Sequence, residues 1–211
     1  MKILNLYAGI GGNRKFWGNE HEITAVEFDE ATAEFYQKLF PNDKVIIADA
    51  HQFLLDKFNE YDFIWSSPPC PTHSIVRLSS VSRGYSQIVY PDMRLYQEII
   101  LLQKFALIEQ KWVIENVIPY YEPLILPTKK LNRHFYWSNF KIKDFEENKK
   151  QNIQNLKGSD TVFGFDVTNS KIKNKQKALR NLVNPNLGLH LLNCALETKE
   201  TERANQLLME I

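Results

Sequence analysis

Residues 62–74 read DFIWSSPPCPTHS, and the strand and loop that they predict set the order of the rest of the chain. Phe63, Ile64 and Trp65 form a short apolar run, which predicts a buried strand that the following serines and prolines end at once. Cys70 then falls on the loop beyond the strand's carboxyl end, where open α/β sheets carry their ligand sites. Two prolines stiffen this loop. A lone cysteine is more often a small buried apolar residue, so the interpretation depends on other motifs.

A glycine-rich turn lies near the start of the chain. The apolar run at residues 3–7 is followed by AGIGG at residues 8–12 and by a helix-compatible segment that reaches Trp17. Glycines would let backbone amides approach a ligand at a helix N-terminus, as in nucleotide-type cofactor pockets. A tight turn would need the same glycines, so both interpretations stay open.

Acidic side chains follow the next two strands. Glu27 comes at the tip of a strand at residues 23–28, where it is placed to accept hydrogen bonds from two ribose hydroxyls. Asp29 suits the start of the following helix. Asp49 follows a third strand at residues 44–47, and it also suits the N-cap of a helix at residues 51–58.

The composition predicts a single globular domain. The chain has 211 residues, of which 44% are hydrophobic and 24% charged, and its net charge of +1 shows no global basic excess. The first residues lack the pattern of a secretion signal, and no apolar run is long enough to span a bilayer. With two cysteines, we expect a soluble cytoplasmic protein of prokaryotic or phage type with reduced thiols.

The middle of the chain alternates between loop, helix and strand. Residues 71–91 predict a long polar loop without secondary structure, either a mobile functional segment or a solvated insertion. Residues 92–110 predict a core-facing helix without chemistry of its own, with Asp92 as cap. Its apolar positions are Leu95, Ile99, Leu102, Phe105, Ala106 and Ile108. Residues 112–117 predict a buried strand ending in Glu115 and Asn116, where a carboxylate needs a partner or a task.

The last third is more polar. Residues 134–140 predict one more strand, and residues 1–140 would form the catalytic and cofactor-binding domain. Residues 141–180 are lysine-rich, which predicts either a solvated insertion or a basic patch. Residues 181–211 predict a helical segment that packs back on the domain.

Five motifs in a fixed order resemble the C5-cytosine-specific DNA methyltransferase family. They are LNLYAGIGG at 4–12, AVEFDE at 25–30, SSPPC at 66–70, WVIENV at 112–117 and NRHFYWSNF at 132–140. The likeness covers roughly the first two-thirds of the chain. Together with the alternation of strands and helices, it implies a Rossmann-like α/β methyltransferase fold: a mostly parallel twisted sheet with helices on both faces.

The resemblance implies S-adenosyl-L-methionine as cofactor and assigns residues to three roles. The catalytic residues would be Cys70, Glu115, Asn116 and Arg133. The cofactor-binding residues would be Tyr7, Ala8, Gly9, Gly11, Gly12, Glu27, Phe28, Asp49, Ala50 and Pro68. The substrate-binding residues would be Ser67, Pro69, Ser74, Arg77, Arg83 and His134. The family carries a pair of arginines where this chain reads Asn132-Arg133-His134, with one arginine.

The resemblance also implies the reaction. The Cys70 thiolate would add to C6 of a cytosine flipped out of DNA, Glu115 would assist at N3, and the methyl group would pass to C5. Residues 141–180 leave no room for the family's target-recognition domain. Specificity would then come from the loop at residues 71–91, a partner subunit or a homodimer. Residues 184–192, NPNLGLHLL, resemble the C-terminal segment that closes the cofactor pocket in the family. No metal is implied.

Three alternatives stay open. An NAD- or FAD-dependent oxidoreductase shares the glycine turn and the acid after the second strand, but residues 8–17 lack the full spaced-glycine fingerprint. A methyltransferase fold without activity would bind DNA or a partner. A cytosine-5 methyltransferase acting on RNA would use the same residues.

Overall fold

One sheet runs through the molecule. The structure, a computed structural model, describes residues 1–146 and 162–209, with side chains as far as residue 197. Within these residues, seven strands follow the order β3-β2-β1-β4-β5-β7-β6. The strands are β1 (Lys2–Leu6), β2 (Glu22–Glu27), β3 (Lys44–Ile47), β4 (Phe63–Ser66), β5 (Lys111–Val117), β6 (Lys129–Leu131) and β7 (His134–Ser138).

The sheet is mostly parallel. Strands β1 to β5 pair in parallel, and β7 runs antiparallel to both β5 and β6. The strand order reverses between β1 and β4, and the register pairs Leu6 with Val26 on one side and Ser66 on the other. The ends of three strands are therefore level at the switch point where such sheets bind ligands. The predicted fold class is confirmed.

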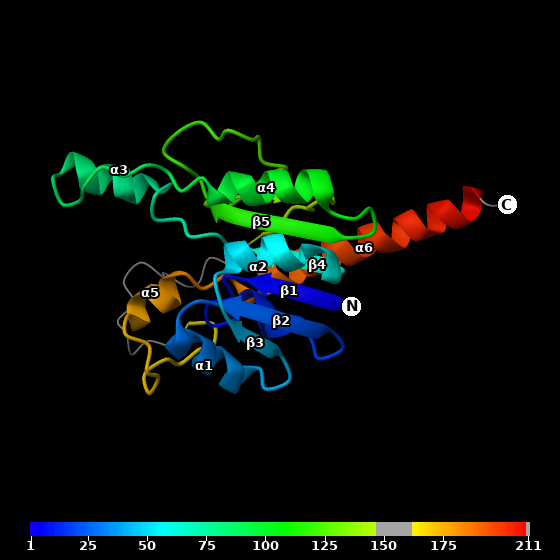
Figure 1. The fold of residues 1–211 in the computed structure, drawn as a ribbon, viewed down its shortest axis with the longest axis horizontal. Coiled ribbons are helices and arrows are strands. Elements are labelled where there is room, and N and C mark those ends of the chain that lie inside the picture. The colour runs from blue at the N-terminus through cyan, green and yellow to red at the C-terminus, as the bar shows by residue number, and fades with distance from the viewer. Residues whose placement is uncertain (147–161, 210–211) are drawn as a thin grey trace.

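Helices cover both faces, as expected. They are α1 (Glu30–Leu39), α2 (Ala50–Lys57), α3 (Ile75–Ser82), α4 (Arg94–Phe105), α5 (Lys175–Arg180) and α6 (Pro185–Met209), with 3-10 turns η1 (Asn13–Phe16) and η2 (Phe58–Glu60). Alternate strand residues face opposite sides, so Leu4 and Leu6 join the core under α2 and α4, whereas Ile3 packs with residues of α6. Figure 1 shows α4 over β5, α3 standing out from the body and the end of α6 extending past the sheet.

The short helices are set by local capping. Asp29 caps α1 and accepts a hydrogen bond from the Thr32 amide, and Asp49 caps α2 through the amide of His51. Both carboxylates satisfy amides that have no partner within the helix. α6 begins at Pro185, because proline suits the first turn of a helix.

Two predictions about the first half of the chain are wrong. The segment after the glycines forms only η1, because Gly11 and Gly18 adopt positive φ on either side of it. The stretch at residues 71–91 is not without secondary structure, because Ser74 caps α3 and accepts a hydrogen bond from the Arg77 amide at 3.3 Å. Most of the large apolar side chains on α3 face solvent, so no core-facing pattern announces the helix.

The helix predicted at residues 92–110 is shorter than expected. α4 starts at Arg94 and ends at Phe105, and Met93 rather than Asp92 occupies the N-cap. Leu95, Ile99 and Leu102 are buried as predicted. Phe105 and Ile108 are 64% and 85% exposed, so their expected place in the core is wrong, because the helix ends before it turns them inward.

The lysine-rich region contains a small apolar cluster. Ile10 of the glycine turn packs with side chains of residues 162–182, which are Val162, Phe165, Val167, Ile172, Leu179 and Leu182. A purely solvated insertion is therefore wrong for residues 162–182, and the part of that prediction at residues 147–161 lies outside the described residues. The helical segment expected at residues 181–211 forms α6, from Pro185 to Met209.

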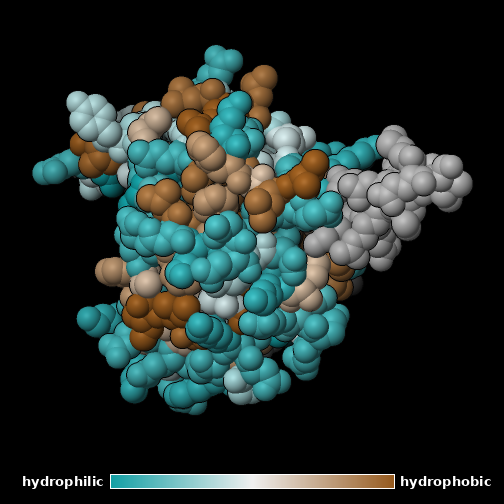
Figure 2. Space-filling view, turned by 45° about the vertical axis from the view of Figure 1, so that its right-hand side comes forward, coloured by the Kyte–Doolittle hydropathy of each residue, from teal (hydrophilic) through white to brown (hydrophobic). Residues whose placement is uncertain are grey.

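In the part of the chain that the structure describes, every helix is too short or too polar to cross a membrane. The surface seen in Figure 2 is mostly hydrophilic, with apolar patches in its upper half, at the height where Figure 1 places α3 and α4.

Candidate active site

The cysteine loop is held by the neighbouring strand. Pro68 is buried, and its carbonyl accepts a hydrogen bond of 2.9 Å from the side-chain amide of Asn116 on β5. The side-chain oxygen Oδ1 of Asn116 in turn accepts a hydrogen bond of 3.0 Å from the backbone amide of Val117. Because Asn116 is only 2% exposed, both bonds are shielded from water. The loop that carries Cys70 is thus fixed to the end of β5.

The Cys70 thiol lies in the electrostatic field of Glu115. Burial raises the pKa of the Cys70 thiol, and the nearby carboxylate of Glu115 raises this pKa further. Lys177 of α5 acts in the opposite direction and lowers it. The charge of Glu115 therefore acts on the thiol of the predicted nucleophile, and so does the charge of Lys177, a cation that the sequence did not single out. Cys70 and Cys194 form no disulfide with each other.

Arg133 lies in the turn between β6 and β7, and His134 is the first residue of β7. Asn132 adopts φ 51° in this turn, and Arg133 is exposed with its carbonyl accepting a bond from the Ile118 amide. His134 begins β7 opposite Val117, two residues along β5 from Glu115. Directly paired residues share a face and faces alternate, so His134 lies on the Glu115 face. Arg133 lies in the turn before β7, and its catalytic role stays a prediction.

The cofactor side of the site is built around Glu27. Its carboxylate accepts hydrogen bonds of 2.9 Å from the amides of Gly9 and Asp29, which fix the side chain at the end of β2. The neighbouring Phe28 is 77% exposed, so an aromatic ring lies open beside it. A fixed carboxylate and an exposed ring suit the ribose and base of a nucleoside.

The three glycines have different surroundings. Gly9 adopts φ 55°, and a side chain added there would meet only the Tyr7 carbonyl, at 4.0 Å. At Gly11 an added Cβ would lie 2.3 Å from the Phe40 ring, and at Gly12 it would lie 2.4 Å from the Val183 carbonyl. Only Gly9 leaves open space. At Gly11 and Gly12 the missing side chains make room for the protein itself, and the predicted contact of these two residues with a ligand stays a prediction.

Ala8 and Ala50 are buried at 6% and 3% exposure and pack in the core beside the pocket. Asp49 is about half exposed, and its second oxygen lies 3.9 Å from a guanidinium nitrogen of Arg94. Asp49 therefore caps α2 as predicted, and its exposed carboxylate leaves its cofactor-binding role as a prediction.

The predicted substrate residues have mixed surroundings. Ser67 accepts a hydrogen bond of 2.8 Å from the indole two residues before it, and Ser74 caps α3. Arg77 donates to the carbonyl of Gln87 at 2.6 Å, so it closes its own loop. Pro69 and Arg83 are exposed. Among the described contacts of these five residues, only the side chains of Pro69 and Arg83 have no hydrogen bond within the protein.

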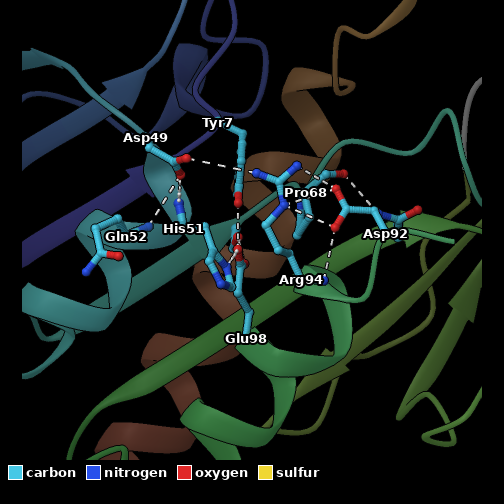
Figure 3. A network of polar contacts seen from close by, with 10 residues as sticks. Tyr7, Asp49, His51, Gln52, Pro68, Asp92, Arg94 and Glu98 are labelled. Atoms are coloured by element: carbon cyan, nitrogen blue, oxygen red, sulfur yellow. Dashed lines mark hydrogen bonds and ion pairs between the residues drawn. The ribbon is translucent and has the colours of Figure 1, made fainter. Parts of the chain in front are cut away.

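A polar network that the sequence did not predict lies between the two halves of the site (Figure 3). Its centre is Glu98 of α4, which is 1% exposed and accepts hydrogen bonds from Tyr7, His51 and Ser66. The predicted core-facing helix thus carries a buried charged group that the sequence analysis did not single out. One signal was available, since Glu98 lies between Leu95 and Ile99 on the apolar face.

His73 was also missed. Its ring is fully buried, and Nδ1 lies 2.5 Å from the Tyr121 hydroxyl. Its amide donates to the Cys70 carbonyl at 3.0 Å, so it anchors the turn after the thiol. Burial lowers the pKa of His73, which keeps the imidazole neutral.

Two further features lie apart from the site. A hollow of about 340 Å³ is lined by Leu102, Trp112 and Asn139 among others, at the start of β5 and so at the end away from Glu115. Among the described residues, no cluster of His, Cys, Asp and Glu has the spacing of a metal site.

Residues 1–100 match the sequence model of the C-5 cytosine-specific DNA methylases. The match covers a little under half of the chain. The matched part includes Glu27, Asp49 and Cys70, together with Glu98 of the polar network. S-adenosyl-L-methionine is the methyl donor of the family.

Solved methyltransferase structures are similar to parts of this chain. The methyltransferase EhMeth of Entamoeba histolytica is 18% identical, over 56% of this chain and 38% of its own, with a TM-score of 0.36. A DNMT2 variant of Spodoptera frugiperda is 27% identical, over 55% and 35%, with a TM-score of 0.39. A SAM-dependent methyltransferase of Agrobacterium tumefaciens is 15% identical, over 57% and 40%, with a TM-score of 0.39. The chain thus spans two-fifths or less of their lengths. No curated protein matches it.

Proposed function

We propose that this chain transfers a methyl group from S-adenosyl-L-methionine to C5 of cytosine in DNA. The observation that carries the proposal is the hydrogen bond by which Asn116, the neighbour of Glu115 on β5, fixes the loop that holds Cys70. A thiol and an acid at one sheet edge match the needs of addition to a pyrimidine ring. The match of residues 1–100 to the methylase family supports the same reaction.

The thiol supplies the covalent step. Cytosine C5 is a poor nucleophile, so the Cys70 sulfur adds to C6 and the ring gains electron density that C5 can donate. Glu115 gives a proton toward N3 as this charge develops. After methylation the C5 proton leaves to a base, the bond between Cys70 and C6 breaks to release the thiolate, and the N3 proton returns to Glu115, which restores the aromatic ring. Because the pKa of the thiol is raised, addition requires that its proton be removed, and Lys177 favours the anion.

The pocket side would hold the methyl donor, which supplies an electrophilic methyl group when bound. Glu27 would accept from the ribose hydroxyls, Phe28 would lie against the base and Asp49 would accept from its amino group. Gly9 gives the chain's closest open backbone approach on this side. The residues present fit the cofactor.

The target atom is inaccessible in a stacked duplex, so the cytosine must leave the helix to reach Cys70. His134 lies on the Glu115 face and is placed to contact the flipped base. Arg83, exposed at the end of α3, is placed to contact phosphates. In the described residues 139–146 and 162–184, no separate recognition domain is formed, so we assign sequence choice to residues 71–91 or to a second chain.

Methyl transfer tests the proposal directly. The chain is incubated with labelled S-adenosyl-L-methionine and mixed-sequence duplex DNA, single-stranded DNA or tRNA. We expect label in C5 of cytosine in DNA, none with Cys70→Ser, and full activity with Cys194→Ser, the matched control for the second thiol. Label in tRNA alone would replace DNA by RNA as the substrate.

A non-catalytic role is the second candidate, because Arg133 lies in a turn and His134 takes the place beside Glu115. If no nucleic acid is methylated and the chain still binds DNA with equal affinity after Cys70→Ser, the non-catalytic role replaces the proposal.

A further inference from the structure

The first two turns of α4 join the two halves of the site. Arg94 and Glu98 are four residues apart and so lie on one face of the helix. We propose that Glu98, assisted by Arg94, is a positioning residue that couples the cofactor side to the cysteine loop. The inference rests on the proposed function, because it concerns how the same site is held.

Glu98 makes the first of two connections between the cofactor side and the cysteine loop, and this connection needs only one side chain. Its Oε1 accepts a hydrogen bond of 2.6 Å from the Tyr7 hydroxyl and lies 3.0 Å from Nδ1 of His51, in the first turn of α2. Its Oε2 accepts from the Ser66 hydroxyl at 2.6 Å. Ser66 ends β4 four residues before Cys70, whereas Tyr7 follows β1 and His51 lies in α2, next in sequence to the predicted cofactor residues Ala8 and Ala50. One carboxylate therefore touches both sides (Figure 3).

Arg94 makes the second connection. Its guanidinium lies 3.9 Å from Asp49 on the cofactor side and donates to Asp92 at 2.6 Å. The Asp92 amide donates to the Thr72 hydroxyl at 2.9 Å, and Thr72 lies two residues after Cys70. The cysteine is thus flanked by two residues, Ser66 and Thr72, that are each linked to the cofactor side through α4.

The burial of Glu98 argues against a role in folding alone. A carboxylate removed from water is costly unless donors compensate it, and apolar side chains of similar volume often fill such a site as well or better. Here the three donors come from three separate elements of one sheet edge. Tyr7 is also held at φ 54°, which few residues with a side chain adopt. A fixed Tyr7 hydroxyl holds the glycine turn in that conformation.

The test compares Glu98→Gln with Glu109→Gln, an exposed acid just beyond the same helix. Glutamine keeps the size of Glu98 but loses the charge. We expect Glu98→Gln to weaken binding of S-adenosyl-L-methionine roughly tenfold by calorimetry, and Glu109→Gln to leave it unchanged. Circular dichroism and thermal unfolding establish that both variants fold.

A second readout needs neither cofactor nor DNA. The charged groups that face the His51 ring are Glu98 and Arg94 of α4 and Asp49 at its own helix start. We expect the pH titration of the His51 imidazole, followed by NMR, to move to lower pH in Glu98→Gln and to stay in place in Glu109→Gln.

A double-mutant cycle tests the coupling itself. Ser66→Ala removes the hydroxyl on the cysteine side, so we expect it to weaken cofactor binding in the wild-type background and to have little further effect in Glu98→Gln. Additive effects of the two changes, or unchanged cofactor binding in folded Glu98→Gln, would overturn the inference. If the wild-type chain binds the cofactor without methylating DNA, the proposed function fails while the cycle still decides the coupling.

Discussion

The Cys70 thiol is the residue on which the site depends, and its surroundings act on it in opposite directions. Burial and the Glu115 carboxylate raise the pKa of the thiol, and Lys177 lowers it. A partly buried thiol with a raised pKa is a weak nucleophile at neutral pH. We infer that the thiol loses its proton more readily once Glu115 has taken up a proton from solvent and donates a hydrogen bond to N3, because a neutral carboxyl group no longer opposes the thiolate.

The two charged neighbours predict shifts of opposite sign. In a Cys194→Ser background, Glu115→Gln removes a negative neighbour and should lower the pKa of Cys70, whereas Lys177→Gln should raise it. The rate of alkylation by iodoacetamide as a function of pH measures both. Equal profiles for the two variants would show that neither charge acts on the thiol.

His73 predicts a pH dependence of stability. Burial lowers its folded pKa, so the unfolded chain binds a proton that the folded chain does not. The neutral His73 contributes to the stability of the folded chain above about pH 6.5, the ordinary histidine pKa. This contribution is lost as the pH falls through the lower pKa that His73 has in the folded chain.

The measurement is urea unfolding at pH 7.5 and at pH 5.5, for wild type and for His73→Gln. The wild type should lose more stability than the variant over this interval. The raised pKa of His51 acts with the opposite sign in both proteins and cancels in the comparison. Parallel losses would mean that His73 titrates alike in the folded and unfolded chains.

Among the elements, α3 combines a defined structure with a surface that the protein leaves uncovered. Ile75 and Val76 are 67% and 73% exposed on a helix that directly follows the cysteine loop. Because these side chains contribute little buried area, their replacement should hardly change the folding free energy. An apolar surface beside a nucleophile suits contact with a base or sugar once DNA is bound.

The double variant Ile75→Ser/Val76→Ser tests this element. We expect its free energy of unfolding to stay within about 0.5 kcal/mol of wild type, and its affinity for duplex DNA to fall at least about threefold. Ile108→Ser is the matched control, since Ile108 is 85% exposed and follows α4. A fall in affinity of the same size in the control would assign the effect to general surface polarity.

At the scale of the whole molecule, α6 closes the chain onto its own beginning. Gly188 lies against the backbone of Asn13 in η1, where an added Cβ would come within 2.3 Å of the Asn13 carbonyl oxygen. Gly12 meets the Val183 carbonyl in the same way. Leu187, Leu191 and Leu192 continue the contact into the core beneath Trp17. The glycine turn is therefore held from both sides.

Gly188→Ala should reverse the usual effect of alanine in a helix. Alanine normally stabilises a helix interior by about 1 kcal/mol relative to glycine. Here the contact is with backbone that cannot move aside, so we expect destabilisation of about 1–3 kcal/mol. Asn186→Ala, exposed in the same turn of α6, should change stability by no more than about 0.5 kcal/mol. Thermal unfolding measures both, and a stabilised Gly188→Ala would contradict this packing.

Sequence reasoning succeeded where the cause of structure is local. The strand before Cys70 and the helices capped by Asp29 and Asp49 follow from neighbouring residues, and the structure has them. Glu98 was missed because its partners Tyr7 and His51 lie 91 and 47 residues away. Such contacts exist only once the sheet order is known. α3 was missed because its exposed apolar residues lack the pattern of a buried face.

The site shows the same limit. Cys70, Glu115 and Asn116 could be chosen because each falls at a strand end, and parallel strand ends meet at one edge. The choice between Arg133 and His134 could not be made, because one residue of register moves a side chain to the other face of a strand. The cluster at residues 162–182 was hidden by the lysines between its apolar residues.

Covalent trapping tests the central claim most directly. The chain is mixed with S-adenosyl-L-methionine and duplex DNA that contains 5-fluorocytosine, from which the C5 substituent cannot leave, and the product is digested and weighed by mass spectrometry. The account predicts a DNA adduct on the peptide that contains Cys70, formed only with the cofactor present. Methylation of ordinary DNA without any adduct at Cys70, or an adduct that persists in Cys70→Ser, would contradict it.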